Sequence, residues 1–591
     1  MDKLTTRFLR TIERCKDRVG LSYKQGQAYQ DITWGEVGRM VTHFAHGLQE
    51  LGFKKGERLA ILEKNSPFWL ISDFATQFLG GVNVPIYNSS TPEQIRYILN
   101  HSGSAYIVVA DQFQYQKVQA VYDSLKPQPV VIMVRDSGEG DKVYTFQQVL
   151  DKGKEKGGQA LKELDAQRDV DDMVSVVYTS GTTGNPKGVM LSHKNFGANI
   201  DSFYDLFDFN ETDTILSFLP LSHVLERLAS HFYQVQVGSK IAYAESIEQV
   251  AENLLEVKPT VVISVPRLYE QILRKVHNAV KKQPAIKQKI FQLTTRAAIK
   301  AVRLKMADRN IPFFTRLLDN IGQKLVFQSL RDKTGGRMRF FISGGAPISV
   351  DCIEFFFAAR MPIYEGYGLT ETAPVLAVNC PGNVRFGTVG KPLTSVSIKI
   401  ADDGEILAKG ENVMQGYYKE ESATREAIDA DGWFHTGDIG NLDAQNYLKI
   451  TDRKKNIIVM SNGKNVAPSA IEKAIGKCSL VVQNIVLGDN EKYLVALAVV
   501  DVDNLKALAD GMGIPGTMAQ LLQDPRIVDA VKKAVDKQTK EFASFERVRR
   551  IALLERPWTE ESGELTPTKK PKRRVIMANN QATIDRLFNR T

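Results

Sequence analysis

The chain has 591 residues, enough for several domains, and its hydrophobic content of 43% is ordinary for a globular protein. The formal net charge of +9 indicates attraction to polyanions or to an acidic membrane surface, and we interpret the charges as distributed along the chain rather than massed in one block. The four cysteines are far apart and form no CxxC pair, which disfavours a zinc site or a disulfide framework and indicates a reducing, cytosolic compartment. No stretch approaches the roughly 18 to 20 apolar residues of a membrane span, so any membrane contact is expected to be peripheral.

Short β-rich runs alternate with helical patterns through most of the chain. The runs are RLAIL (58–62), AYIVVA (105–110), PVVIMV (129–134), TVVISV (260–265) and RFFIS (339–343). This alternation predicts an α/β fold with buried, largely parallel strands. Residues 269–334 instead predict a basic helical insertion, whose lysines and arginines we interpret as a solvated face.

A shift in composition follows Asp452. RKKNIIVMSNGKNVAPSAIEKAI predicts a strand, a glycine-containing turn and a helix, and YLVALAVVDV predicts a further strand. We therefore expect a large N-terminal domain over residues 1–452, built from several subdomains with mainly parallel sheets. A small α+β domain is expected over residues 453–591.

The loop YTSGTTGNPKG (178–188) combines glycines, hydroxyl residues and one lysine. The strand-like MVSVVY precedes it and GVMLSHKNF follows it, which puts the loop at a strand end, where α/β folds bind ligands. Close backbone approach, hydroxyls and a cation suit phosphate oxygens, although a flexible surface loop of small residues is the alternative. The loop is not a Walker A motif, because its lysine follows a proline. The candidate phosphate-binding residues are Thr179, Ser180, Gly181, Thr182, Thr183, Gly184 and Lys187.

The string YTSGTTGNPKGVMLSH resembles the phosphate-loop signature of the acyl-adenylate-forming superfamily, which includes acyl-CoA synthetases, luciferases and peptide-synthetase adenylation domains. Further matching motifs follow in the order of that superfamily: FLPLSHVLER (218–227), SGGAP (343–347), YEGYGLTET (364–372), GWFHTGDIG (432–440), TDRKKNIIVMSNGKNVAP (451–468) and LTPTKKPKRR (565–574). The resemblance covers nearly the whole chain. FLPLSHVLER and SVPRLYEQI most resemble long-chain fatty acyl-CoA synthetases.

The resemblance implies a set of ATP-binding residues. An aromatic ring has the flat face that adenine needs, and a carboxylate with a neighbouring hydroxyl suits phosphate and Mg²⁺. Tyr367 and the backbone of Gly345, Ala346 and Pro347 are expected to hold adenine, Asp438 the ribose hydroxyls, and Arg453 ribose and phosphate. Thr370 and Glu371 are expected to hold the phosphates, with Glu371 also binding the metal, and Gly368 is a further expected ATP-binding residue.

The basic TKKPKRR near the C-terminus reads in isolation as a nuclear-localisation or nucleic-acid-binding patch. The resemblance instead places the family's mobile catalytic lysine here, at Lys570, with Lys569 as the alternative. A positioned lysine stabilises the negative charge on the α-phosphate and on the attacking carboxylate. Asp452 and Lys455 are the expected hinge of the mobile small domain.

Three further residues have expected roles on the acyl and CoA side. His223 lies in a motif that the resemblance places near the acyl site, and a structural histidine is the alternative. Gly463 and Lys464 are expected to face the site only after the small domain rotates to admit coenzyme A.

The function implied is ATP- and Mg²⁺-dependent activation of a long-chain fatty acid to acyl-CoA through an acyl-AMP intermediate, with release of AMP and pyrophosphate. Lys570, Thr370 and Glu371 are the expected catalytic residues. An alternative is a fatty acyl-AMP ligase that delivers the acyl group to a carrier protein, and a remote one is a basic nucleic-acid-binding protein. A cytoplasmic enzyme on the inner face of the membrane is expected, with no nucleic-acid partner, and a homodimer stays open.

Overall fold

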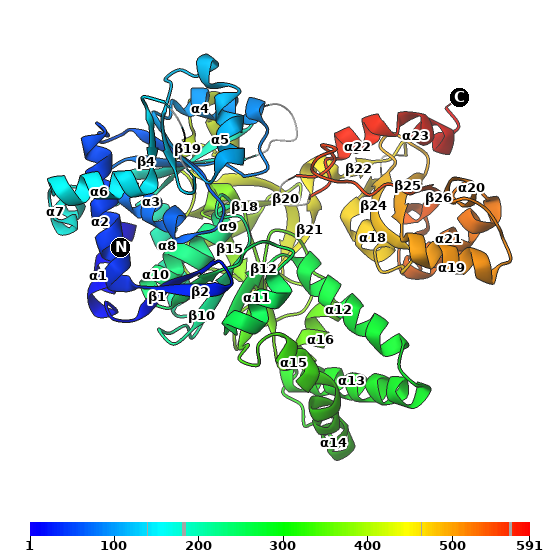
Figure 1. The fold of residues 1–591 in the computed structure, drawn as a ribbon. Coiled ribbons are helices and arrows are strands. Elements are labelled where there is room, and N and C mark those ends of the chain that lie inside the picture. Colours follow the sequence, from blue (N-terminus) through cyan, green and yellow to red (C-terminus); the bar gives the residue numbers. More distant parts are fainter. Residues whose placement is uncertain (137, 139, 180–184, 463, 567–569, 591) are drawn as a thin grey trace.

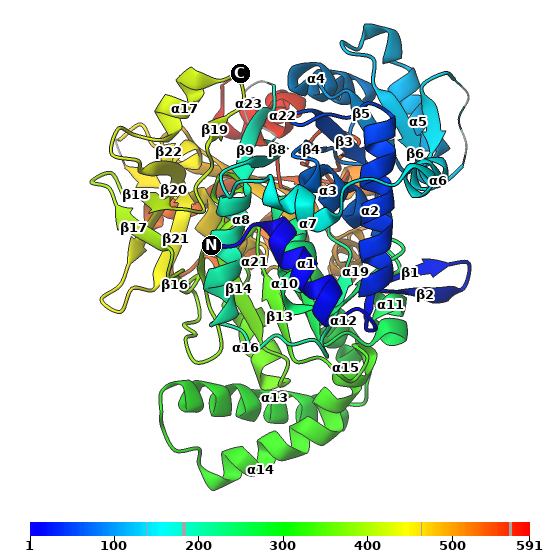
Figure 2. The ribbon, with the colours of Figure 1, turned by 90° about the vertical axis from the view of Figure 1, so that its left-hand side faces the viewer.

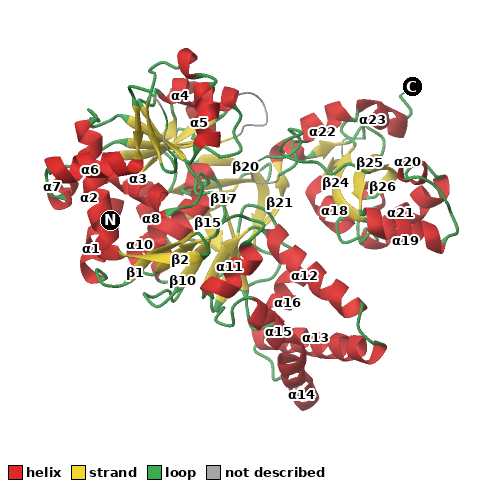
Figure 3. Ribbon diagram, viewed as in Figure 1, coloured by secondary structure: helices red, strands yellow, loops and turns green. Residues whose placement is uncertain are grey.

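The computed structural model describes residues 1–136, 138, 140–179, 185–462, 464–566 and 570–590 (Figure 1). A large N-terminal domain with mixed, mostly parallel sheets precedes a smaller C-terminal domain of helices and short sheets (Figure 3). The predicted α/β class with a small α+β domain is confirmed. Among the described residues, no helix has the length and apolar character needed to cross a bilayer.

The first large sheet has eight strands in the order β19-β9-β8-β4-β3-β5-β6-β7. Strands β8 to β7 in that order are parallel, whereas β9 and β19 run antiparallel to their neighbours. Its strands are β3 (Arg58–Leu62), β4 (Val82–Pro85), β5 (Tyr106–Val109), β6 (Val130–Met133), β7 (Val143–Thr145), β8 (Met173–Thr179), β9 (Lys187–Ser192) and β19 (Gly416–Tyr417).

Helices cover both faces of this sheet. Leu59 and Ile61 of β3 share a core with α2, α3 and α6, whereas Ala60 and Leu62 share another with α4 and α5. Burial on both faces explains the uninterrupted apolar run RLAIL. The covering helices are α2 (Trp34–Glu50), α3 (Pro67–Phe78), α4 (Pro92–Ser102), α5 (Gln112–Gln119) and α6 (Phe146–Lys156).

The second large sheet has nine strands in the order β16-β15-β14-β13-β12-β10-β11-β1-β2, and its centre from β14 to β1 is parallel. Its strands are β1 (Val19–Gln25), β2 (Ala28–Thr33), β10 (Thr214–Ser217), β11 (Lys240–Tyr243), β12 (Val261–Ser264), β13 (Phe340–Ser343), β14 (Ile363–Gly368), β15 (Val375–Val378) and β16 (Lys391–Pro392). The five predicted strand runs correspond to β3, β5, β6, β12 and β13, so those predictions are confirmed.

An antiparallel sheet of four strands follows in the chain, in the order β17-β18-β20-β21. Its strands are β17 (Val396–Ile400), β18 (Glu405–Gly410), β20 (Phe434–Leu442) and β21 (Leu448–Arg453). The remaining N-terminal helices outside the stretch 266–333 are α1 (Leu4–Arg14), α7 (Leu161–Ala166), α8 (His193–Tyr204), α9 (Val224–Glu226), α10 (Tyr233–Val237), α11 (Val250–Val257), α16 (Val350–Ala358), α17 (Glu421–Ala427), the 3₁₀ turns η1 (Tyr122–Ser124) and η4 (Thr370–Thr372), and the π-helix η2 (Arg227–Phe232).

The stretch predicted as a helical insertion is helical and projects from the body of the N-terminal domain (Figures 1 and 2). It comprises α12 (Pro266–Lys281), α13 (Ala285–Met306), α14 (Phe313–Gly322), the π-helix η3 (Gln323–Phe327) and α15 (Gln328–Lys333). α13 and α14 form a hairpin whose tip lies farthest from the sheets (Figure 2).

The C-terminal domain is built around the sheet β24-β25-β26, in which β25 pairs antiparallel with β24 and parallel with β26. Its strands are β22 (Ile458–Val459), β23 (Asn465–Val466), β24 (Val481–Leu487), β25 (Leu494–Val500) and β26 (Val548–Leu554). Its helices are α18 (Pro468–Ile475), α19 (Val502–Gly511), α20 (Met518–Leu521), α21 (Pro525–Gln538), α22 (Arg573–Asn579) and α23 (Gln581–Phe588), with 3₁₀ turns η5 (Lys454–Asn456) and η6 (Ser544–Glu546).

Helix α18 joins the C-terminal domain to the N-terminal domain. At its start, the backbone N–H and the hydroxyl of Ser469 each donate to the Asp452 carboxylate at 2.8 Å. One turn further on, Lys473 donates to the backbone carbonyl of Ile348, which lies after β13. These polar contacts hold the two domains in the arrangement that brings the C-terminal lysine segment to the site described next.

Candidate active site

The loop YTSGTTGNPKG joins two antiparallel strands of the eight-stranded sheet. Strand β8 ends at Thr179 and β9 begins at Lys187, and these two residues are directly paired. The loop therefore leaves the sheet at the carboxyl end of β8, as the sequence predicts. The candidate residues Ser180, Gly181, Thr182, Thr183 and Gly184 lie outside the described residues.

Tyr417 links the loop lysine to the predicted metal-binding carboxylate. The Lys187 Nζ lies 4.8 Å from the centre of the Tyr417 ring, and the Tyr417 hydroxyl donates to Glu371 Oε1 at 3.0 Å. Tyr417 is placed by β19, which pairs with β9. Burial raises the pKa of Glu371, and hydrogen bonds from its own backbone and from Tyr417 act in the opposite direction. Sequence reasoning missed Tyr417, because a tyrosine within QGYYKE carries no local functional signal.

The predicted adenine-binding elements lie on neighbouring parallel strands. Gly345, Ala346 and Pro347 follow β13 and are exposed, and Tyr367 lies in β14, which pairs with β13. Gly345 has φ +77°, a conformation that favours glycine. Because parallel strands end at the same sheet edge, the turn and the ring come together there.

The segment after β14 is tightly folded. Gly368 packs against the backbone of Pro374 so closely that a Cβ atom would lie 1.7 Å from its carbonyl oxygen, which excludes any larger residue. Thr370 and Glu371 follow in η4. The backbone carbonyl of Glu371 accepts a hydrogen bond from the N–H of Met414. The predicted phosphate and metal residues are thus held by a fixed turn.

Asp438, Arg453 and Tyr367 form one group, joined by a hydrogen bond and an ion pair. The Tyr367 hydroxyl donates to Asp438 Oδ2 at 2.7 Å, and Arg453 Nε lies 3.1 Å from Asp438 Oδ1. The residue pair 438 and 453 is fixed by the register of β20 and β21. Burial raises the pKa of Asp438, while Arg453, Tyr367 and Lys570 favour its ionised form. The Arg453 side chain is 51% exposed, so its guanidinium is accessible to a ligand.

Lys570 comes from the C-terminal domain and reaches this group. Burial and then repulsion from Arg453 lower the pKa of Lys570 to about 8, while Asp438 and Glu371 act in the opposite direction. The backbone around it is closed by two hydrogen bonds between Thr566 and Lys570 and by a bridge from Leu565 to Pro571. The alternative Lys569 lies outside the described residues.

His223 lies close enough to Lys570 for the two to interact electrostatically. Burial, and then the charge of Lys570, lower the pKa of His223 to about 4, so the imidazole is neutral near pH 7. Its Nδ1 accepts from the N–H of Leu225 at 3.2 Å and caps the short helix α9. The histidine therefore caps α9 at a position beside the site, and its role on the acyl side stays a prediction.

The structure does not bring the predicted CoA-side lysine to this group. Lys464 places its ammonium 4.1 Å from the centre of the Phe545 ring within the C-terminal domain. Gly463 lies outside the described residues. Of the predicted hinge residues, Asp452 is buried against α18, whereas Lys455 is exposed in η5.

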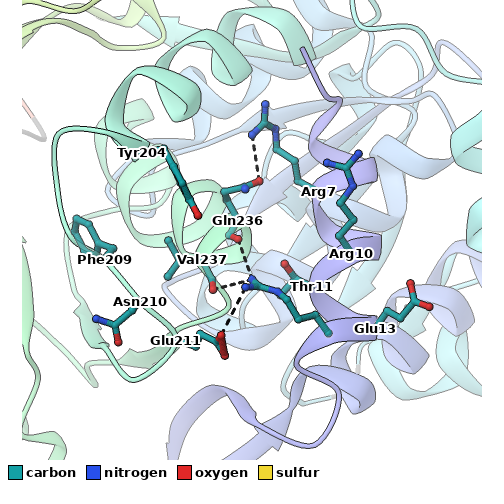
Figure 4. A pocket seen from close by; sticks show the side chains of 11 residues that line it. Arg7, Arg10, Thr11, Glu13, Tyr204, Phe209, Asn210, Glu211, Gln236 and Val237 are labelled. Atoms are coloured by element: carbon teal, nitrogen blue, oxygen red, sulfur yellow. Dashed lines mark hydrogen bonds and ion pairs between the residues drawn. The ribbon is translucent and has the colours of Figure 1, made fainter.

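A surface pocket of about 520 Å³ beside α1 shares no residue with this group (Figure 4). Arg7 points toward Gln236, to which it donates at 3.1 Å, and it also pairs with Asp201 at 2.7 Å. Arg14, also in the lining, pairs with Glu211 at 3.7 Å. Because these arginines already pair with acidic side chains, the pocket offers little positive charge to an anionic ligand.

Two family patterns match the sequence. The one described as AMP-binding enzyme matches residues 8–418, and the one described as AMP-binding enzyme C-terminal domain matches residues 455–591. The first covers more than two thirds of the chain. The first match lies in the N-terminal domain, and the second covers the C-terminal domain with Lys570. Asp438 lies in the short stretch between the two matches.

Similar proteins align with nearly the whole length of the chain. Long-chain-fatty-acid--CoA ligase FadD15 of Mycobacterium bovis is 34% identical over 577 residues, covering 95% of this chain and 93% of the relative. Long chain acyl-CoA synthetase 6, peroxisomal, of Arabidopsis thaliana is 34% identical over 92% of this chain and 80% of its own. Among solved structures, the anthranilate CoA ligase AuaEII in complex with anthranoyl-AMP superposes with a TM-score of 0.74 at 18% identity, covering 98% and 97% of the two chains, and supports the fold alone.

Proposed function

The chain belongs to the AMP-binding enzyme family, and we propose that it is a long-chain fatty acid–CoA ligase that activates its substrate with ATP. In the first half-reaction, the fatty acid carboxylate attacks the α-phosphorus of ATP. The bond to the β-phosphate oxygen breaks, which releases pyrophosphate and leaves a fatty acyl-AMP. In the second half-reaction, the CoA thiol attacks the acyl carbon and loses its proton, and AMP leaves.

The observation that carries this proposal is the convergence of Lys570 with Asp438, Arg453 and Glu371, although these residues come from segments far apart in sequence. An ammonium beside a carboxylate and a guanidinium suits the α-phosphate, where negative charge increases during attack. Asp438 is an acceptor suited to two ribose hydroxyls, and Tyr367 offers a face for adenine. In this proposal Lys187 binds the phosphates that leave as pyrophosphate.

Mg²⁺ is part of the proposal as a partner of the ATP phosphates. Among the described residues, no group of three or more His, Cys, Asp or Glu side chains could hold a metal by itself. A single carboxylate such as Glu371 fits Mg²⁺, which commonly takes one or two protein carboxylates and completes its shell with phosphates and water. When bound there, the ion would neutralise phosphate charge, with Thr370 adjacent as a hydroxyl ligand for phosphate.

The second half-reaction requires CoA to reach the acyl carbon. We propose that the C-terminal domain rotates about Asp452 to Lys455 after acyl-AMP forms, which withdraws Lys570 and brings the turn containing Gly463 and Lys464 toward the site. The contact of Asp452 with Ser469 is one that this rotation has to change. A neutral His223 beside the site is proposed to position the acyl group.

The test is a product analysis with purified protein, ATP, Mg²⁺, CoA and fatty acids from short to very long chains. The proposal expects AMP and acyl-CoA in equal amounts, with palmitate among the good substrates. Formation of neither product at any chain length would refute it. Replacing CoA by a phosphopantetheinylated carrier protein distinguishes the acyl-AMP ligase alternative, which would transfer to the carrier and not to CoA.

The nucleic-acid alternative loses support from the contacts of the C-terminal basic segment. Arg573 pairs with Glu472 and donates to the backbone carbonyl of Val486, so this arginine is engaged within the C-terminal domain. Lys570 is buried and interacts electrostatically with Arg453, Asp438 and Glu371. A cytoplasmic location, contact with a membrane surface and a homodimer stay as predictions of the proposed function.

A further inference from the structure

The hairpin segment, defined as residues 281–325, carries the excess positive charge of the chain. It contains eleven lysines and arginines against two aspartates, a formal charge of +9 that equals the net charge of the whole protein. The rest of the chain is therefore balanced. The interpretation that the charges are distributed along the chain rather than massed in one block misses this segment, whose formal charge equals that of the whole protein.

The same segment also exposes large apolar side chains. Of seventeen such side chains exposed among the described residues, nine lie in the hairpin segment. The most exposed are Phe314 and Ile286, each at 76%, Phe313 at 73% and Leu325 at 67%. A water-facing helix normally carries polar residues on its outer face, so clustered exposed aromatic and aliphatic groups mark a contact surface.

These apolar side chains recur at helical spacing on neighbouring helices. Ile286, Ile290 and Leu293 follow one face of α13, and on α14 Phe313, Leu317 and Ile321 are spaced four residues apart, which likewise puts them on one face.

The two helices are closely packed, because a Cβ atom on Gly322 would lie 2.9 Å from Cβ of Thr294. The other face of α13 is used in the fold, where Phe291 and Ala298 are buried in a core shared with α16. The apolar stripe, which we define as the exposed side chains of Ile286, Ile290, Leu293, Phe313, Leu317 and Ile321, is therefore additional to what the fold of the hairpin requires.

We propose that the hairpin segment docks on a lipid bilayer that contains anionic headgroups. Basic residues flank the apolar stripe, as in helices that lie in the membrane interface, and a net positive charge is attracted to an anionic surface. The hairpin projects from the body of the protein, so a flat surface can approach it (Figures 1 and 2). Two copies of the hairpin segment would repel each other because each carries a formal charge of +9, which disfavours a homodimer through this surface. Nucleic acid would match the positive charge but would make no use of the exposed apolar side chains.

Docking rests on the proposed function for its purpose, since a long-chain fatty acid partitions into membranes and an enzyme held at the surface would meet it there. In this arrangement Phe313 and Phe314, at the start of α14, enter the interface between headgroups and acyl chains. Lysines such as Lys287 and Lys289 remain at the level of the headgroups.

The experiment is flotation of the full-length protein with vesicles of phosphatidylcholine, with and without phosphatidylglycerol. Wild-type protein is expected to bind the anionic vesicles, and increasing salt should weaken binding. Phe313→Ser/Phe314→Ser and Lys287→Gln/Lys289→Gln should each weaken binding by about tenfold or more. Phe113→Ser, at a phenylalanine 65% exposed on α5, and Lys54→Gln/Lys55→Gln, at exposed lysines elsewhere, are matched controls that should bind like wild type.

Unchanged vesicle binding in both hairpin variants, or an equal loss in the controls, would overturn the proposal. A dimer in sedimentation velocity that Phe313→Ser/Phe314→Ser dissociates would instead assign the stripe to a second copy. Binding to duplex DNA that only the lysine variant loses, without vesicle binding by wild type, would assign the charge to nucleic acid.

Acyl-CoA formation from detergent-dispersed fatty acid is measured in parallel. It should be the same in all variants, and its absence from every protein would refute the proposed function while leaving the docking result to be judged by flotation.

Discussion

Two aspartate–arginine pairs in the N-terminal domain have the same chemistry and opposite surroundings. Asp73 and Arg227 are fully buried, with contacts of 2.8 Å from Nε and 2.6 Å from Nη2. Arg227 also donates to the Ser175 hydroxyl at 2.7 Å. Asp438 and Arg453 share one contact of 3.1 Å, and half of the Arg453 side chain is exposed.

The difference separates a structural pair from a candidate binding pair. Rings of Trp69 and Phe232 lie within 5.1 Å of the Arg227 guanidinium, which completes its enclosure. Breaking such a buried pair leaves an uncompensated charge in the interior. The Arg453 side chain is half exposed, and Lys570 of the C-terminal domain interacts electrostatically with the pair. The guanidinium of Arg453 is therefore accessible to an anionic ligand.

The largest effect is expected on stability, at the buried pair. Arg227→Met should lower the free energy of unfolding by about 3 to 5 kcal/mol, because the Asp73 carboxylate loses its charge partner in the interior. Arg453→Met, the same change at the half-exposed pair, should lower it by less than about 1 kcal/mol. Urea denaturation measures both, and equal losses in the two variants would remove the distinction between the pairs.

The next effect is expected on chemistry, at Lys570. Lys570→Ala should slow acyl-AMP formation by about a hundredfold to a thousandfold, since it removes one positioned charge from the site. Thioester formation from supplied acyl-AMP should be largely retained. Rapid-quench measurement of the two half-reactions, with Lys572→Ala as a control, tests this. Two intact half-reactions would show that Lys570 is the wrong lysine and would direct attention to Lys569.

A smaller effect is expected on ATP binding at Asp438. Asp438→Asn should raise the KM for ATP by about tenfold or more, because hydrogen bonds to a charged acceptor contribute roughly 1.5 to 3 kcal/mol. Tyr367→Phe keeps the carboxylate and removes only one donor to it, so its effect should be smaller. Initial rates at varied ATP concentration measure both, and thermal melting checks the fold. An unchanged KM in Asp438→Asn would contradict the ribose assignment.

The smallest effect concerns pH. The pKa of Lys570 is lowered to about 8, and the ammonium is its useful form, so acyl-AMP formation should fall by about threefold between pH 7.5 and 8.5. Lys570→Arg, although less active, should lose this decline because arginine stays charged. The free energy of unfolding should change with pH in the opposite direction to the rate of acyl-AMP formation. Because the folded pKa lies below the unfolded value, the stabilising contribution is complete above the unfolded pKa and is lost as pH falls through about 8. A decline retained in Lys570→Arg would assign it to another group.

Much of the fold and of the candidate site could be predicted because its signals are local. Apolar runs bounded by turns identified strands such as β3 and β12, since strands buried on both faces need continuous apolar sequence. The motifs that contain Lys187, Tyr367, Asp438 and Lys570 were recognisable together, by their order along the chain, whereas TKKPKRR alone reads as a nucleic-acid-binding patch. The structure adds that these residues come together in space, which requires strands of different sheets for Lys187, Tyr367 and Asp438 and the C-terminal domain for Lys570.

The features that were missed depend on contacts between distant segments. Nothing near Asp73 in the sequence identifies Arg227, which lies 154 positions away, as its partner. Tyr417 gains its place between Lys187 and Glu371 only through the short pairing of β19 with β9. The helical pattern predicted an insertion over residues 269–334, but the exposed face of α13 is decided by where α16 packs, and no local pattern contains that information.

The measurement that tests the central claim most directly is ATP–pyrophosphate exchange with fatty acid in the absence of CoA. Wild-type protein should incorporate labelled pyrophosphate into ATP only when a long-chain fatty acid is present, because acyl-AMP formation is reversible while the adenylate stays bound. Adding CoA should then drive the reaction to acyl-CoA and AMP. No exchange with any fatty acid, in protein shown to be folded, would contradict the assignment of the Lys570 group to acyl-adenylate formation.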